Sequence, residues 1–192
     1  MVVNMELPQD SRYLVVPEDL FATAESSFYS GEFVCPVFSQ GSDLYYFDNP
    51  LTYSFTVTNT SGALLVMGTI AGKGRVACAR CLEDALVEVE GEIEGYYLLP
   101  HSSRELTQEE EDEYIVLGED RTIDLEPLFG AAISLALPLI PLCRDDCKGL
   151  CPQCGHNLNE GSCSCEEQED DSNNPFAVLK TLTFEEKDDD QS

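Results

Sequence analysis

The sequence has few basic residues. Ten Lys and Arg stand against 37 Asp and Glu among 192 residues, and the formal net charge is −27. Binding to phosphate groups over a broad face depends on clustered Lys and Arg, so this composition argues against such a face for bare nucleic acid and against an anionic membrane surface. The hydrophobic fraction of 43% is sufficient for a core, and the length suits one domain, with or without a small appendage.

The sequence also lacks a long uninterrupted apolar run. Its most apolar stretch, 125–143, contains Glu126 and Gly130 and is interrupted by three prolines, so we expect no membrane span. The first residues show no basic segment followed by an apolar one, so we expect no secretory signal. A cytoplasmic protein is therefore expected, with cysteines that serve as metal ligands or redox groups rather than as disulfides.

Signs of a catalytic site are scarce. The two histidines, His101 and His156, lie near no obvious nucleophile in the sequence, and there is no glycine-rich phosphate loop. Carboxylate pairs are too abundant in this composition to indicate acid–base catalysis. We therefore expect a protein that is not an enzyme and that has no small-molecule substrate.

The middle of the chain contains segments in which apolar and polar residues alternate. The pattern predicts strands at 53–57, at 64–70 after a Ser61-Gly62 turn, and at 85–97. In the last of these, apolar side chains face one side and glutamates the other: Val87, Val89 and Ile93 against Glu88, Glu90, Glu92 and Glu94. Short connections between the strands indicate antiparallel pairing.

One main helix is predicted after the strands. Asp124 can cap it, Pro127 is tolerated in its first turn, and Pro138 ends it. Apolar residues recur at spacings of three and four: Leu125, Leu128, Phe129, Ala132, Ile133 and Ala136. A second, short helix is expected to begin at Asn174-Pro175.

Eight of the nine cysteines occur in four closely spaced pairs: Cys78 and Cys81, Cys143 and Cys147, Cys151 and Cys154, Cys163 and Cys165. The sequence around the third pair, Cys151-Pro152-Gln153-Cys154-Gly155, resembles a zinc knuckle, in which the glycine permits a positive φ. Because Zn²⁺ prefers four tetrahedral ligands, eight cysteines predict two structural zinc sites.

We favour a local site made by the last two pairs and a second site that joins the first two. An alternative in which the second pair joins the knuckle stays open, as does His156 in place of Cys163 or Cys165. Free thiols, a redox pair or an iron–sulfur cluster are the competing interpretations. Cys35 is expected to be a small buried hydrophobic residue in a strand.

Half of the basic residues lie in or near the cysteine segments: Lys73, Arg75, Arg80, Arg144 and Lys148. They are candidate RNA contacts. The alternative is that they offset the charge of about −2 on each Zn(Cys)₄ centre.

The fold class that follows is α+β: an antiparallel, sheet-rich domain with one main helix, a C-terminal zinc-knuckle segment and a short terminal helix. We divide the chain into an N-terminal arm (1–30), a core of sheet and helix (31–142), a Cys-rich zinc-binding segment (143–166), a linker with a short docking helix (167–184) and a disordered acidic tail (185–192).

Four motifs in this order resemble the YceD family of bacterial and plastid proteins: CARCLE at 78–83, LALPLIPLC at 135–143, CKGLCPQCGHNLN at 147–159 and NPFAVL at 174–179. The resemblance spans about 30–183, and some members keep only the first Cys-x-x-Cys. It implies a non-enzymatic ribosome-biogenesis factor that supports synthesis, processing or stability of large-subunit ribosomal RNA.

The expected partner is a ribosomal RNA precursor, or a basic large-subunit ribosomal protein or assembly factor. The glutamate row could bind a basic partner, although a solvated strand face explains it equally well. A zinc-ribbon adaptor or a thiol redox-responsive regulatory protein is the alternative function.

Overall fold

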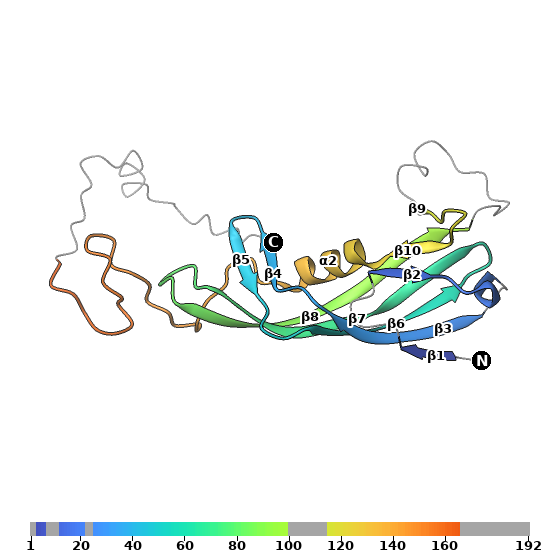
Figure 1. Ribbon diagram of the computed structural model, residues 1–192. Helices are drawn as coiled ribbons and strands as arrows, with labels where there is room; N and C mark the ends of the chain where they lie inside the picture. The colour runs from blue at the N-terminus through green and yellow to red at the C-terminus, as the bar shows by residue number, and fades with distance from the viewer. Residues whose placement is uncertain (1–2, 7–11, 22–24, 100–114, 166–192) are drawn as a thin grey trace, which may run out of the picture. The chain divides into compact units, whose positions relative to one another are not determined.

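The computed structural model describes residues 3–6, 12–21, 25–99 and 115–165 (Figure 1). By their contacts the residues divide into two compact units, 1–149 and 150–192. The division into five segments expected from the sequence stays a prediction. The expected terminal helix and acidic tail lie outside the described residues. So does the polar, acidic segment 101–112, for which the sequence predicts a loop.

The first unit is built on a mostly antiparallel sheet. Its central strands are β3 (Ser26–Phe33), β6 (Leu51–Asn59), β7 (Ala63–Ala77) and β8 (Asp84–Leu98), each antiparallel to the next. Two short strands pair in parallel at the sides, β1 (Val3–Glu6) with β3 and β9 (Ile115–Val116) with β8. The hairpin of β4 (Val37–Gln40) and β5 (Asp43–Tyr46) joins β7 through the pair Tyr46–Arg75.

A second, two-stranded sheet pairs β2 (Tyr13–Val15) with β10 (Thr122–Asp124), and a short 3₁₀ helix, η1 (Glu18–Phe21), follows β2. The first 30 residues, which were expected to form an N-terminal arm, thus include β1, β2 and η1, and β3 begins within them. No helix among the described residues is long and apolar enough to cross a membrane.

The three strands predicted from alternation are confirmed, and each is longer than predicted. The turn between β6 and β7 forms because Ser61 and Gly62 adopt positive φ of 64° and 118° and Asn59 Oδ1 accepts the Ser61 N–H at 2.9 Å. On β8 Val87, Val89 and Ile93 are buried and all four glutamates are exposed, as alternation on a sheet with one covered face requires.

The predicted helix is confirmed as α2 (Leu125–Ala136). Asp124 caps it by accepting the Glu126 N–H at 3.0 Å, and Leu137 follows its last turn in extended conformation, as a residue before proline prefers. Figure 1 shows α2 along the sheet beside β8. Leu125, Leu128, Phe129, Ala132 and Ile133 form its buried face.

Helix and sheet approach closely at Gly91 of β8. A Cβ atom there would lie 2.4 Å from the Ala132 carbonyl oxygen, so this contact requires glycine. Aromatic rings fill the layer between α2 and the sheet: Phe129 lies 5.0 Å from Phe33 and 4.7 Å from Tyr53, centroid to centroid. This core holds α2 against the sheet, and the segment after α2 supplies half of the first cysteine group.

Candidate metal centres

The first cysteine pair lies in the tight turn between β7 and β8. The Leu82 N–H donates to the Cys78 carbonyl at 2.9 Å, and the Cys78 N–H donates to the Glu83 carbonyl at 2.8 Å. Leu82 has a φ of 65°, which is unfavourable for a side chain with a Cβ. The turn therefore holds Cys78 and Cys81 close together at the expense of backbone strain in Leu82.

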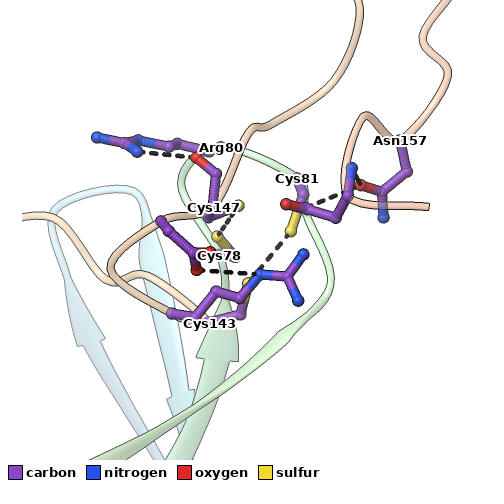
Figure 2. A network of polar contacts seen from close by, with 9 residues as sticks. Cys78, Arg80, Cys81, Cys143, Cys147 and Asn157 are labelled. Atoms are coloured by element: carbon purple, nitrogen blue, oxygen red, sulfur yellow. Dashed lines mark hydrogen bonds and ion pairs between the residues drawn. The ribbon is translucent and has the colours of Figure 1, made fainter. Parts of the chain in front are cut away.

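The segment after α2 brings the second pair to this turn. The Ala79 N–H donates to the Pro141 carbonyl at 2.8 Å, and Arg80 Nη1 donates to the Cys147 carbonyl at 2.8 Å. Figure 2 shows Cys78 facing Cys147 and Cys81 facing Cys143. These four cysteines are the first group, which links the β7–β8 turn to the segment that follows the helix.

Sulfur separations in the first group fit a tetrahedral metal centre. The Sγ atoms of Cys78 and Cys147 are 3.8 Å apart, those of Cys81 and Cys143 are 3.6 Å apart, and all four lie within 4.8 Å of one another. Four thiolates about 2.3 Å from a central Zn²⁺ would lie about 3.8 Å apart. All nine cysteines are free, without disulfides. The donor set therefore fits one ion of a thiophilic metal.

The second group belongs to the second unit and consists of Cys151, Cys154, Cys163 and Cys165, whose sulfur atoms also lie within 4.8 Å of one another. Its turn repeats the first one. The Gly155 N–H donates to the Cys151 carbonyl at 2.9 Å, and Gly155 has a φ of 72°. Glycine here occupies the position that Leu82 occupies in the first group.

The two groups are those of the favoured partition. His156 is not a member of the second group; its carbonyl instead accepts the Cys151 N–H at 2.8 Å. Cys35 was expected to be buried in a strand. It lies instead in the connection between β3 and β4 and is half-buried, because Pro36 cannot supply an N–H to continue β3.

In the absence of a metal, each group contains one acidic thiol. Burial raises the pKa of Cys78, but the backbone N–H groups of Arg80, Cys143 and Cys81 outweigh burial and hold it at about 6. Backbone N–H groups of Cys154 and Gln153 likewise lower the pKa of Cys151 to about 6. Each group thus has one thiolate ready at neutral pH.

Two other thiols, one in each group, keep their protons at neutral pH. Burial and neighbouring thiols raise the pKa of Cys143 to about 12, and the thiol of Cys154 together with burial raises the pKa of Cys165 to about 12. Binding of a metal therefore has to displace protons, which makes it dependent on pH.

The five basic residues that were candidate RNA contacts are engaged within the protein. Arg75 binds Asp48 through two hydrogen bonds of 2.9 and 3.0 Å and also Asp84 at 3.3 Å. Lys73 pairs with Glu88 at 2.6 Å and Arg144 with Asp146 at 3.5 Å. Arg80 donates to the Cys147 carbonyl, and Lys148 also has a polar partner. The described residues show no separate basic patch at these positions.

Comparison with known proteins assigns the family. A family model described as large ribosomal RNA subunit accumulation protein YceD matches residues 66–183, which include both cysteine groups. This chain belongs to the YceD family. The resemblance in the sequence motifs is thereby confirmed, with a match that begins within β7.

Several relatives share this region. Uncharacterized proteins from Mycobacterium tuberculosis and Mycobacterium bovis are 40% identical over 105 residues, which cover 55% of this chain and 50% of each relative. An Arabidopsis thaliana protein named large ribosomal RNA subunit accumulation protein YCED homolog 1, chloroplastic, is 33% identical over 61 residues, 32% of this chain and 19% of that protein. The chain spans about half the length of the mycobacterial relatives. No solved structure matches it.

Proposed function

We propose that this YceD-family protein is a non-enzymatic ribosome-biogenesis factor. It supports accumulation of large-subunit ribosomal RNA, and each of its two cysteine groups holds a structural zinc ion. The observation that carries the proposal is the family match over 66–183. The four-thiolate donor sets support zinc, which favours tetrahedral sulfur coordination without redox chemistry.

The partner that best suits this surface is a basic protein of the large subunit or a basic assembly factor. Glu88, Glu90, Glu92 and Glu94 line the sheet face opposite α2, where β7 places Lys73, Ala71, Thr69 and Met67 beside them. Only Glu88 of these four forms an ion pair within the described part of the chain. Glu90, Glu92 and Glu94, which pair with no cation among the described residues, attract a basic surface and speed its association.

Direct binding of RNA has less support. Three of the five candidate contacts already pair with carboxylates, and these carboxylates would repel a phosphate that approached the same guanidinium or ammonium group. Binding to RNA would have to break these pairs in a protein with a net charge of −27. The ion pairs offset nearby acidic groups, in line with the alternative interpretation of the basic residues.

Capture of partners from a cell extract tests the proposal. The tagged chain is expected to retain a basic ribosomal protein or assembly factor at low salt, and to lose most of it at moderate salt, since exposed charges are screened. Ribonuclease treatment should leave the captured protein in place. If all captured ribosomal material disappears with ribonuclease, RNA is the partner and the basic-protein proposal fails.

Replacement of three glutamates of β8 by lysine tests whether this glutamate row is the surface that binds the partner. E90K/E92K/E94K is expected to abolish capture, whereas D19K/E119K/E160K, which changes the net charge equally at other exposed positions, should retain it. Equal loss in both variants would mean that only the net charge matters. In cells that lack the protein, a lower ratio of large- to small-subunit ribosomal RNA is expected, and an unchanged ratio would contradict the biogenesis role.

A further inference from the structure

The two cysteine groups differ in how far solvent reaches their sulfur atoms. In the first group Cys78, Cys81 and Cys147 are 0%, 4% and 2% exposed, and only Cys143 is half-buried. In the second group Cys151 alone is buried, Cys163 and Cys165 are half-buried and Cys154 is exposed. An incoming ligand has to reach a metal or its thiolates before it can replace them, so accessibility governs exchange.

An opening lies directly beside the second group. It has a volume of about 220 Å³ and is lined by three of the four cysteines, Cys151, Cys163 and Cys165, together with Pro152, Leu158, Ser162 and Gln153. Such a space admits a small thiol or a chelating ligand up to the sulfur atoms. The lining belongs entirely to the second unit.

The two groups also differ in what surrounds their ligands. The first joins segments that are 62 to 69 residues apart in sequence, and these segments are further tied by the Ala79–Pro141 and Arg80–Cys147 hydrogen bonds. Its ligands cannot separate without opening that junction. The second group closes within 151–165, where one antiparallel bridge, Leu150–Asn157, and short turns hold the backbone. Its ligands can therefore separate by local opening alone.

From these differences we propose that the second group is a releasable metal site: a small competing ligand removes its ion while the first group keeps its own and the first unit stays folded. This rests on the proposed metal binding of the function above. The second unit then gains or loses ordered structure with the supply of metal or small thiols, whereas the first unit stays folded throughout.

Zinc release from the full-length holoprotein tests whether the second group loses its ion before the first group does. The Cys35→Ser variant removes the ninth thiol, so that every remaining cysteine belongs to a group. With an excess of the chelator 4-(2-pyridylazo)resorcinol, release is expected in two phases of equal size, separated by at least tenfold in rate. N-ethylmaleimide added after the fast phase should label Cys151, Cys154, Cys163 and Cys165, and far-ultraviolet circular dichroism should still report the sheet.

A pair of variants tests the opening itself. Ser162→Phe narrows the opening and should slow the fast phase at least threefold, whereas Ser164→Phe, an exposed neighbour outside the lining, should leave it unchanged. Equal slowing by both variants, or none, would overturn the role of the opening.

Other outcomes also decide between the proposals. Joint release of both ions with loss of the sheet, or earlier labelling of the first group, would overturn the order of release and leave the zinc proposal intact. A second group that holds no ion even after zinc is added would overturn the releasable site. Absence of metal from both groups would instead contradict the metal binding proposed above.

Discussion

At the scale of single residues, the turns that hold Cys78 with Cys81 and Cys151 with Cys154 share one backbone shape. They differ in the residue that adopts the positive φ. Leu82 adopts a φ of 65° where the equivalent Gly155 adopts 72°. A residue with a Cβ costs about 1–2 kcal/mol in this region, and Leu82 is 68% exposed, so its side chain recovers little of that energy by burial. The packing of the described residues does not explain why a leucine stands at this position.

Leu82→Gly is therefore expected to raise the free energy of unfolding by up to about 1 kcal/mol, because relief of strain exceeds the added entropy of the unfolded chain. Gly155→Ala should do the reverse in the second unit and weaken zinc retention there. Urea unfolding measures the first change and competition with a chelator the second. A destabilised Leu82→Gly protein would show that the leucine side chain makes a stabilising contact.

Tyr97 provides a second prediction at this scale. Burial, with the nearby negative charge of Asp124, raises its pKa to about 12 from an ordinary value of 10. A raised pKa in the folded protein gives stability that is fully present below pH 10 and is lost as the pH rises toward 12. The free energy of unfolding should fall by on the order of 1–2 kcal/mol over this window because of Tyr97.

Tyr97→Phe removes the titrating group and keeps the ring. The variant is expected to lose that part of the alkaline destabilisation, which guanidinium unfolding at pH 9, 10 and 11 would show. The difference between the two proteins should be small at pH 9 and grow with pH. A difference that is constant from pH 9 to pH 11 would contradict the raised pKa.

At the scale of elements, the contact of α2 with β8 depends on a residue without a side chain. A Cβ at Gly91 would lie 2.4 Å from the Ala132 carbonyl oxygen, whereas a Cβ at Gly130 of α2 would meet no atom within 4 Å. Gly91→Ala is expected to destabilise the first unit by about 1–3 kcal/mol, since helix and strand must move apart. Gly130→Ala should stabilise it by up to about 1 kcal/mol through helix propensity.

Urea unfolding followed by circular dichroism compares these two variants. Because both exchange glycine for alanine, their difference isolates the close approach from the general effect of the substitution on the unfolded chain. Similar unfolding midpoints for the two variants would mean that the helix accommodates the added methyl group at no cost.

Local patterns explain which elements could be predicted from the sequence. Alternation identified β6 and β8, and capping with apolar spacing identified α2, because each signal lies within a few residues. The second half of β7, after residue 70, was missed since Gly72 and Gly74 interrupt its pattern. In the structure a Cβ at Gly72 would meet the Leu51 side chain and one at Gly74 the Phe47 ring, so these glycines make room for neighbouring side chains.

Pairing between distant segments could not be predicted in the same way. The β2–β10 pair joins residues more than a hundred positions apart through three residues on each strand, and nothing in either segment specifies the other. The cysteine groups combine a local signal, which the sequence shows, with a pairing of distant segments, which it does not. Their close spacing made all eight candidate ligands visible, but the association of the first pair with the second depends on the junction of hairpin and helix, which only the fold supplies.

At the scale of the whole molecule, the two groups are expected to stabilise different units. The first connects the β7–β8 turn to the segment after α2 and closes a loop of more than 60 residues. Closing so long a loop removes much of the entropy of the unfolded chain, and the bound metal adds its own binding energy. The second group lies within 151–165 and connects no element of the first unit.

Double variants separate these contributions. Cys78→Ser with Cys81→Ser should lower the free energy of unfolding of the sheet by several kcal/mol, because the buried ligands lose their metal and the junction opens. Cys151→Ser with Cys154→Ser should change the free energy of unfolding of the sheet by less than about 0.5 kcal/mol, as expected for independent sites. The same variant should lower the zinc content by one ion. Thermal unfolding and zinc analysis of the same samples would check both. If the second pair destabilised the sheet as much as the first, the two units would unfold as one, and loss of either ion would remove the acidic face that the proposed basic partner binds.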